Sequence, residues 1–248
     1  MKKVLSIVLS LVFLLSVLEG VNATALATGC NHNYKTTIEK TTPTHSGYVE
    51  HICTKCGDEH YKYLEKITVR LSKKVFAYNG KVRKPKVSAN YSSDCYKVIY
   101  PKGMKKPGKY TVKIVFNDEY HSGTAKKDFW IVKKPAQVKG VKAVENIYDD
   151  ECEIVAVTKW KKVKGASGYQ VKVGDYEEGS GNKIYWYSAW NGKKIIRKGA
   201  SKTSFKTNFI YGSDYGFSFV KVRAYKTVNG KKVYGKWSKA VKLKRVYR

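Results

Sequence analysis

The residues best suited to chemistry lie near the N-terminus, where Cys30-Asn-His32 is followed by Cys53-Thr-Lys-Cys56-Gly57. Two cysteines on a two-residue spacer form one half of a metal knuckle, and the Cys-x-His pair supplies a second half. Together Cys30, His32, Cys53 and Cys56 fill a tetrahedral zinc site and leave no open position for a substrate. The sequence therefore predicts a structural zinc ion, and a zinc hydrolase is excluded by the ligand count.

The size of the surrounding module, residues 28–65, favours the same interpretation. A segment of about forty residues cannot bury enough apolar surface to fold unaided, whereas structural zinc contributes on the order of 10 kcal/mol of folding free energy. The Cys-x-His and Cys-x-x-Cys-Gly motifs resemble the small zinc-ribbon-like modules of exported clostridial proteins. That resemblance also implies a structural metal.

Other uses of these cysteines compete with zinc. A redox role for Cys53 and Cys56 would need a thioredoxin-like βαβ pattern, which does not surround them. Disulfides are compatible with export, but three cysteines in the module leave one unpaired and give His32 no role. The other histidines of the module are expected to be exposed bystanders, with His51 the only substitute ligand among them: His45, His51 and His60.

The chain begins with the layout of a secretory signal peptide over residues 1–27. Lys2-Lys3 precedes the apolar run 4–18, and small residues follow up to Ala27, with small-x-small cleavage patterns ending at Ala25 and Ala27. The apolar run is short for a bilayer span, so we expect no transmembrane anchor beyond the signal peptide. A secreted, extracellular or cell-surface location follows. No Leu-Pro-x-Thr-Gly motif is found before the last residue, so covalent wall anchoring is not expected.

The charge balance points to an anionic partner. Lys and Arg number 49 against 19 Asp and Glu, a formal net charge of +30, and the excess is uneven: −1 over residues 28–65, +14 over 66–134 and +16 over 135–248. So basic a surface attracts polyanions. For an exported protein we expect an anionic cell-wall polymer or glycan, with other surface proteins as further partners, and not nucleic acid.

Residues 66–134 predict a first β-sandwich. Short runs rich in β-branched and aromatic residues are separated by turn residues at regular intervals, which is typical of a sandwich. The runs are 67–71, 75–78, 86–89, 96–100, 110–116 and 128–132. The segments Tyr78-Asn-Gly80, Lys84-Pro-Lys-Val87, Gly108-Lys-Tyr-Thr-Val112 and Tyr120-His-Ser-Gly-Thr124 resemble bacterial immunoglobulin-like repeats of surface proteins.

Residues 135–248 predict a second β-sandwich. Apolar and polar residues alternate up to Trp160 and again from Tyr169, on either side of a Gly-rich turn. This pattern predicts two successive antiparallel strands with both aromatics in the core. The set Trp160, Gly168-Tyr169, Val222-Arg-Ala-Tyr225 and Gly235-Lys-Trp237-Ser resembles a fibronectin type III domain of secreted Gram-positive proteins. The expected fold is therefore all-β, with two tandem antiparallel β-sandwiches, immunoglobulin-like and then fibronectin type III-like, after the zinc-knuckle module.

Two features of the second sandwich depart from that pattern. Phe217 and Phe219 share one face of a strand, but Val220 and Val222 then take the inward positions, which predicts a β-bulge near Phe219-Val220. The connection 174–198 is also long, and it holds four aromatics that could stack on sugars or form an extra strand with Trp186 facing away from both tyrosines. These aromatics are Tyr185, Trp186, Tyr187 and Trp190.

The sequence offers little for catalysis. Outside the zinc module the only histidine is His121, in a turn, and the adjacent Glu177 and Glu178 would point apart in an extended loop. Cys95 and Cys152 are expected to be buried or free thiols, with a bridge between them as the alternative. We therefore expect a non-enzymatic binding, adhesion or spacer protein of the cell surface. The alternative is a secreted carbohydrate-binding or accessory protein that uses the aromatic segment 184–190.

Overall fold

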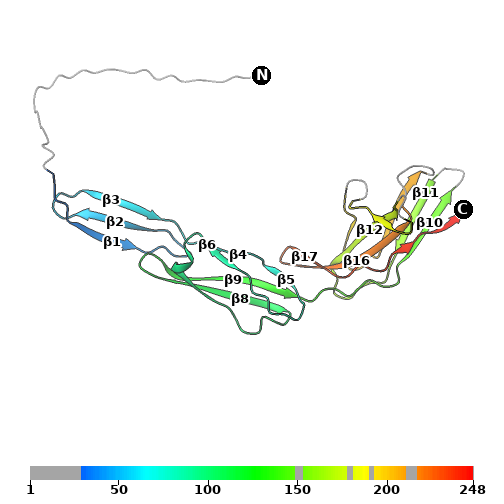
Figure 1. Ribbon diagram of the computed structural model, residues 1–248, viewed down its shortest axis with the longest axis horizontal. Coiled ribbons are helices and arrows are strands. Elements are labelled where there is room, and N and C mark those ends of the chain that lie inside the picture. Colours follow the sequence, from blue (N-terminus) through cyan, green and yellow to red (C-terminus); the bar gives the residue numbers. More distant parts are fainter. Residues whose placement is uncertain (1–28, 149–152, 178–180, 190–192, 211–216, 248) are drawn as a thin grey trace, which may run out of the picture. The chain divides into compact units, whose positions relative to one another are not determined.

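The structure, a computed structural model, describes residues 29–148, 153–177, 181–189, 193–210 and 217–247 (Figure 1). Secondary structure in these residues is almost entirely β, and most strand pairs are antiparallel, which confirms the predicted all-β class. The described chain forms two compact units. Unit 1 consists of the residues up to Thr37 together with Val49–Lys62, and unit 2 consists of Ile38–Tyr48 and the residues from Tyr63 onward.

The elements follow in chain order. The N-terminal sheet has the order β1-β2-β3, with β1 at Tyr34–Glu39, β2 at Gly47–Cys53 and β3 at Glu59–Leu64. Unit 2 continues with β4 Val69–Leu71, β5 Val75–Ala77, β6 Val87–Ala89, the 3₁₀ turn η1 Ser93–Cys95, β7 Tyr96–Ile99, β8 Gly108–Asn117 and β9 Ser122–Val132. It ends with β10 Lys142–Tyr148, β11 Glu153–Lys159, β12 Gly168–Tyr176, β13 Ile184–Trp186, β14 Ile196–Lys198, β15 Ser204–Ile210, β16 Phe219–Val228, β17 Lys231–Tyr234, β18 Val241–Lys242 and β19 Lys244–Tyr247.

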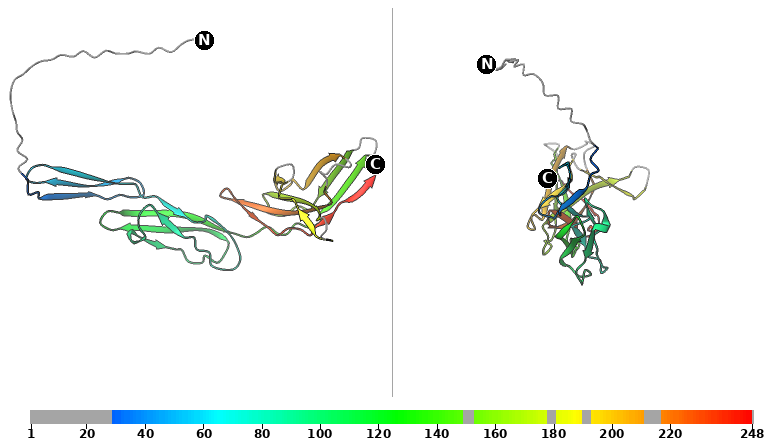
Figure 2. Two further views of the ribbon diagram at one scale, coloured as in Figure 1. Left: turned by 45° about the horizontal axis from the view of Figure 1, so that its top comes forward. Right: turned by 90° about the vertical axis from the view of Figure 1, so that its left-hand side faces the viewer.

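The first sandwich of unit 2 packs the sheet β4-β6 against the sheet β5-β9-β8-β7. Its longest element is the β8–β9 hairpin, green in Figures 1 and 2, paired without interruption from Gly108↔Ile131 to Asn117↔Ser122. Along β8 the side chains of Val112, Ile114 and Phe116 are buried, while Lys113 between them is exposed. This period of two places the apolar half of the strand in the core and the polar half in water.

The second sandwich packs the sheet β15-β11-β10-β19 against a sheet built around β13-β12-β16-β17. One core cluster draws buried residues from both sheets, among them Ala156 of β11, Val171 of β12 and Val222 of β16. Each sheet of the molecule draws its strands from within one of the three ranges 28–65, 66–134 and 135–248. The domain boundaries at these positions stay predictions.

Trp160 and Tyr169 lie in the core of this sandwich, as predicted. Trp160 is 5% exposed and Tyr169 is 0% exposed, and their rings meet edge to face with centroids 5.3 Å apart. The Tyr169 hydroxyl accepts a hydrogen bond from the backbone N–H of Val163 and donates one to the carbonyl of Ala200. Because both bonds are made to backbone, this side chain also fixes the two loops that cover it.

Gly168 explains why the turn before Tyr169 is rich in glycine. A Cβ placed on Gly168 would meet the carbonyl oxygen of Arg197 and the ring of Tyr225, so the backbone of β12 approaches its neighbours too closely for a side chain. The glycine is thus required by packing.

One detail of the predicted strands is wrong. The β12–β16 register runs unbroken through Val173↔Val220 and Gly174↔Phe219, so there is no bulge at Phe219-Val220. The alternation of inward-facing side chains is interrupted ahead of β16. Phe217 is buried in the core cluster although it precedes the first residue of that strand. Within the mainly antiparallel sheets, β5 pairs with β9 and β10 pairs with β19 in parallel.

No helix among the described residues is long and apolar enough to cross a bilayer. The predicted signal peptide, residues 1–27, and Cys152 lie outside the described residues.

Replacing Trp160 by Ala should lower the free energy of unfolding of the second sandwich by about 3–5 kcal/mol, because a fully buried indole is lost and a cavity is left. Chemical denaturation followed by circular dichroism measures this. Tyr247→Ala is the control, since Tyr247 is 66% exposed in the same sandwich and its loss should change stability by no more than about 0.5 kcal/mol. Equal effects of the two substitutions would show that Trp160 does not support the core.

Candidate metal centre

The four predicted ligands converge at one place in unit 1. Cys30 and His32 precede β1, Cys53 is the last residue of β2, and Cys56 lies in the turn that leads to β3. One ligand atom from each residue lies within 4.8 Å of every other. The structure therefore brings together all four side chains that the sequence analysis selected.

Backbone hydrogen bonds hold the two ligand-bearing loops together. The carbonyl of Asn33 accepts hydrogen bonds from the backbone N–H and the hydroxyl of Thr54, and the carbonyl of Asn31 accepts one from the Lys55 ammonium group. The knuckle itself closes through a bond from the N–H of Gly57 to the carbonyl of Cys53. Gly57 has a φ of +77°, which explains the glycine after the second cysteine.

The spacing of the ligand atoms fits a tetrahedral metal. The sulfurs of Cys30 and Cys53 are 3.9 Å apart, and the Cys56 sulfur is 3.4 Å from Nδ1 of His32. For zinc bound to sulfur at about 2.3 Å and to nitrogen at about 2.0 Å, the edges of the tetrahedron are about 3.8 Å between sulfurs and about 3.5 Å between sulfur and nitrogen. Both separations match, and none of the cysteines in the cluster forms a disulfide.

The pKa values of two thiols in the cluster are shifted in opposite directions. A hydrogen bond with Cys56, followed by burial and the nearby Cys53, raises the pKa of Cys30 to about 12. Burial alone would raise the pKa of Cys53 as well, but hydrogen bonds from the backbone at Asn33, Cys56 and Lys55 lower it to about 5. Because closely packed sulfurs repel one another when ionised, a divalent cation is the natural counter-charge for this set.

A polar network supports the imidazole of His32. The ring of Tyr34 stacks on His32, with centroids 5.2 Å apart and planes 11° from parallel. The Tyr34 hydroxyl donates to a carboxylate oxygen of Asp58 at 2.6 Å, and that same oxygen is 3.0 Å from Nε2 of His60. The hydrogen bond to Tyr34 lowers the pKa of Asp58 and raises that of Tyr34 to about 12. Such outer contacts orient metal ligands.

The remaining histidines of the predicted module do not join the ligand cluster. His51 bonds through Nδ1 to the hydroxyl of Thr36 at 2.8 Å, His60 bonds to Asp58, and His45 bonds to the threonines of its own turn. His51 is therefore not needed as a substitute ligand, because four ligand atoms already meet without it.

A second group of potential ligands, which the sequence analysis missed, lies in the first sandwich. Cys95, Asp118 and His121 also place ligand atoms within 4.8 Å of one another. Nδ1 of His121 is 2.8 and 2.9 Å from the two oxygens of Asp118, which is the length of a hydrogen bond and shorter than the edge of about 3.3 Å expected between oxygen and nitrogen ligands of one zinc ion. This group is a bonded pair that closes the β8–β9 turn.

Asp118 is the centre of that turn. Its Oδ1 also accepts hydrogen bonds from the backbone N–H groups of Tyr120 and His121, at 2.9 and 2.7 Å. Burial alone would raise the pKa of Asp118, but these hydrogen bonds, the one from the His121 side chain first, lower it. His121 is buried, and next to it Thr41 is fully buried and forms an isolated β-bridge with it.

The side chains of the aromatic segment 184–190 differ in their exposure to solvent. Ile184–Trp186 forms β13, an added strand on β12, as one of the two sequence interpretations predicts. Tyr185 is exposed, whereas Tyr187 packs against the core cluster and meets Tyr185 edge to face. Trp190 lies outside the described residues.

Trp186 belongs to a cation–π arrangement on the outer face of the sheet. The Lys221 ammonium group lies 3.6 Å from the centroid of Trp186 and 5.6 Å from that of Trp237. The Arg223 guanidinium lies 4.4 Å from Trp237 and 4.0 Å from Tyr234. Cations and rings that alternate in this way cover one another's faces, so the described aromatics do not form one flat platform.

Comparisons with known proteins give no family, and the similarity to solved structures is distant. No family model matches the sequence, and no curated protein matches it. Among solved structures, the chain is similar to a Ca²⁺-stabilized adhesin that helps an Antarctic bacterium reach out and bind ice, at 9% sequence identity and a TM-score of 0.33. The match covers 82% of this chain and 57% of the adhesin chain, so the chain spans less than two thirds of that neighbour.

The purified protein should contain about one zinc ion per chain, and Cys53→Ser should lose it, because Cys53 supplies a buried thiolate of the cluster. Elemental analysis measures the metal, and replacement by Co²⁺ should give the visible absorption of a tetrahedral thiolate site. Cys95→Ser is the control and should keep the metal. A metal-free protein whose residues 29–64 remain ordered would contradict this prediction.

Replacing Asp118 by Ala should destabilise the first sandwich by about 1–3 kcal/mol, since the donors at the β8–β9 turn, which include the side chain of the buried His121, lose their acceptor. Because the pKa of Asp118 is lowered on folding, its contribution is present at neutral pH and disappears as the pH falls through that lowered value. Denaturation at neutral and acidic pH tests both statements. Glu119→Ala, in the same turn, should have little effect at either pH.

Proposed function

We propose that the protein is an exported, non-enzymatic component of the cell surface that is held to anionic envelope polymers by its two basic sandwiches. In this proposal the N-terminal module is a zinc-stabilised cap, and the sandwiches, immunoglobulin-like and fibronectin type III-like, act as binding or spacer modules in adhesion. Export rests on the signal-peptide pattern of residues 1–27.

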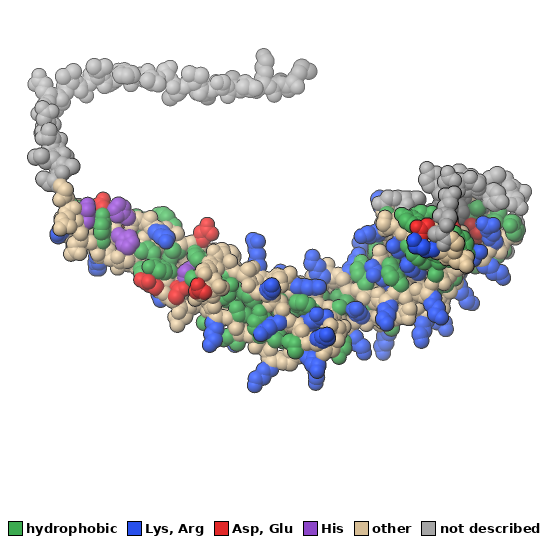
Figure 3. All heavy atoms as spheres, in the orientation of Figure 1, with side chains coloured by type: hydrophobic (Ala, Val, Ile, Leu, Met, Phe, Trp, Pro, Cys, Tyr) green, Lys and Arg blue, Asp and Glu red, His purple; other side chains and the backbone are tan. Residues whose placement is uncertain are grey.

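The observation that carries the proposal is the excess of unpaired cations. Over the described residues, lysine and arginine form ion pairs with carboxylates at three positions, Lys109–Asp128, Lys183–Glu177 and Arg245–Glu145. On the face of the molecule drawn in Figure 3, Lys and Arg side chains are distributed over both sandwiches with few carboxylates between them. With so few compensating acids, the fields of the lysines add over the surface and attract a polyanion.

In this proposal the two clusters of titratable groups described above have structural roles. The Cys and His ligands of the metal cluster number four, which leaves no position for a substrate. Asp118 and His121 bond to each other and close a turn. Neither group combines a nucleophile, a base and an accessible cleft.

Attachment by charge predicts that protein bound to isolated Gram-positive cell walls elutes when salt is added, because counterions then screen the lysines. Retention should also fall stepwise as lysines of the clusters 159–164 and 102–106 are changed to Glu. Binding to phosphate-bearing walls should exceed binding to walls stripped to neutral peptidoglycan.

The control for this experiment is Trp186→Ala, which removes an aromatic but no charge. Retention that survives high salt and disappears in this variant would support the alternative, a carbohydrate-binding accessory protein that uses Tyr185, Trp186, Tyr187 and Trp190. Trp186 lies beneath Lys221 in the structure, so we expect the charge-dependent result.

A further inference from the structure

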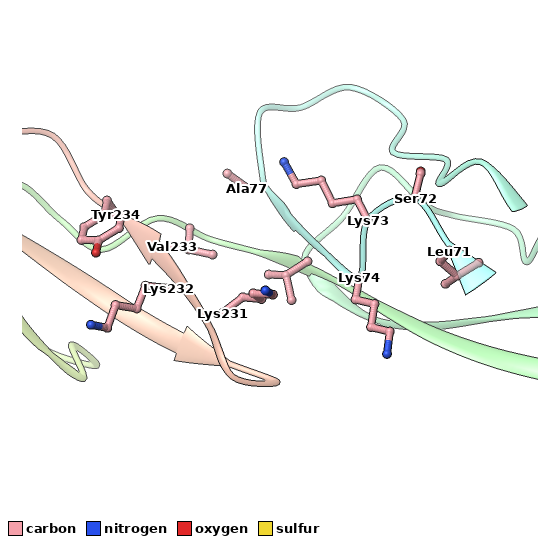
Figure 4. A pocket seen from close by; sticks show the side chains of 10 residues that line it. Leu71, Ser72, Lys73, Lys74, Ala77, Lys231, Lys232, Val233 and Tyr234 are labelled. Carbon is pink, nitrogen blue, oxygen red and sulfur yellow. The ribbon is translucent and has the colours of Figure 1, made fainter.

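A pocket lined by lysines lies between two segments of unit 2 that are far apart in the sequence. It has a volume of about 660 Å³ and is lined by residues 71–75, by Ala77 and by residues 231–234 (Figure 4). Lys73 and Lys74 come from the loop before β5, and Lys231 and Lys232 come from β17. Figure 4 shows Lys231 projecting between the two segments. We call this the lysine pocket.

The base of the lysine pocket is apolar. Val75 and Val233 line it and are both buried, and together with Val132 they form a small core cluster. The pocket therefore combines a floor that can accept a carbon skeleton with a rim of ammonium groups. A volume of this size is within the range of about 300–1,000 Å³ that ligand pockets occupy.

The charge of the pocket is not neutralised by the protein. No carboxylate lines it, and within the described part of the chain the side chains of Lys74 and Lys231 have no bonding partner. Lys73 lies 5.5 Å from the ring of Phe76 and Lys232 lies 4.9 Å from that of Tyr225, contacts that leave their positive charge in place.

The cationic surface continues beyond the pocket. A second concavity, of about 550 Å³, shares Leu71 and Lys74 with the lysine pocket and adds Arg70, Lys126 and Lys127. The carboxylate of Asp128 also lines it, but that group is already engaged by Lys109 and the hydroxyl of Thr111, both at 2.7 Å. An occupant that spans both concavities would meet ammonium groups along its length.

Lysine ammonium groups bind phosphate oxygens as point charges with rotatable donors, so they can follow phosphate groups along a flexible polymer without a fixed bidentate geometry. We propose that the lysine pocket and its continuation bind a polymer in which phosphodiester groups alternate with polyol or sugar units. The apolar floor contacts the carbon units and the rim contacts the phosphates. The proposal rests on the proposed function and locates its binding site.

The test uses the full-length mature protein, folded with its metal, and measures its affinity for soluble polyglycerol phosphate by calorimetry. The site variant is Lys74→Glu with Lys231→Glu. The control is Lys97→Glu with Lys113→Glu, two exposed lysines of β7 and β8 outside both concavities and outside the clusters 159–164 and 102–106, so both variants lose the same net charge. The site variant should lose at least about tenfold in affinity, and the control no more than about twofold, because only the former removes direct contacts.

The outcomes distinguish failure of the lysine-pocket proposal from failure of the proposed function. Equal losses in the two variants would show attraction by overall charge alone, and would overturn the site while leaving the proposed function standing. Tighter binding of polygalacturonate, with the same dependence on Lys74 and Lys231, would overturn the assignment to phosphodiesters. If the unmodified protein binds neither polymer but still binds cell walls, the site is wrong. If it does not bind walls either, the proposed function also fails.

Substitution of exposed lysines should leave folding intact, and thermal unfolding of each variant checks this. Lys74→Gln with Lys231→Gln provides a milder pair, which should weaken binding in the same direction. Unchanged affinity in this neutral variant would count against direct contact with the polymer.

Discussion

The alternation of buried and exposed residues along the strands is the constraint on which the structure depends. In β8, Val112, Ile114 and Phe116 fill the core while Lys113 faces water, and in β16 Val220, Val222 and Ala224 do the same on the inner face of the second sandwich. A thin sandwich has few interior positions, so a chain this rich in lysine must place its cations outside. The folding pattern that supplies the core therefore also produces the basic surface to which we assign binding.

Buried and half-buried polar groups connect loops to the sheets at three places. The Tyr169 hydroxyl bonds to the backbone of two loops, Asp118 collects the donors of the β8–β9 turn, and the buried hydroxyl of Thr41 donates to the carbonyl of Glu65. Each bond ties a loop to a rigid sheet, because an unmade bond at a buried position would cost the full desolvation of the polar group. The Cys and His cluster of unit 1 is suited to the corresponding role, because bonds from these ligands to a metal would replace apolar burial in a module with little core of its own.

The surface features also separate two kinds of binding chemistry. On the outer face of the second sandwich, Lys221 and Arg223 are covered by aromatic rings, and their positive charges are part of a packed cation–π arrangement. In the lysine pocket, Lys74 and Lys231 have no such partner within the described residues and remain available. The same residue type is thus structural in one place and suited to an anionic ligand in the other, and the difference lies in what surrounds it.

The sequence alone determined the features that depend on local spacing. Cys53 and Cys56 sit on one knuckle because of their two-residue spacer and Gly57, and Trp160 and Tyr169 face the core because alternation sets the side of the strand. Tertiary structure alone decided which distant segments meet. Lys74 and Lys231 line one pocket, Asp118 bonds His121 near Cys95, and Trp186 lies beneath Lys221, and none of these neighbours follows from the periodicity of a single strand. The physical reason is that strand periodicity is fixed by the backbone, whereas neighbours between strands are fixed by register and by how the sheets pack.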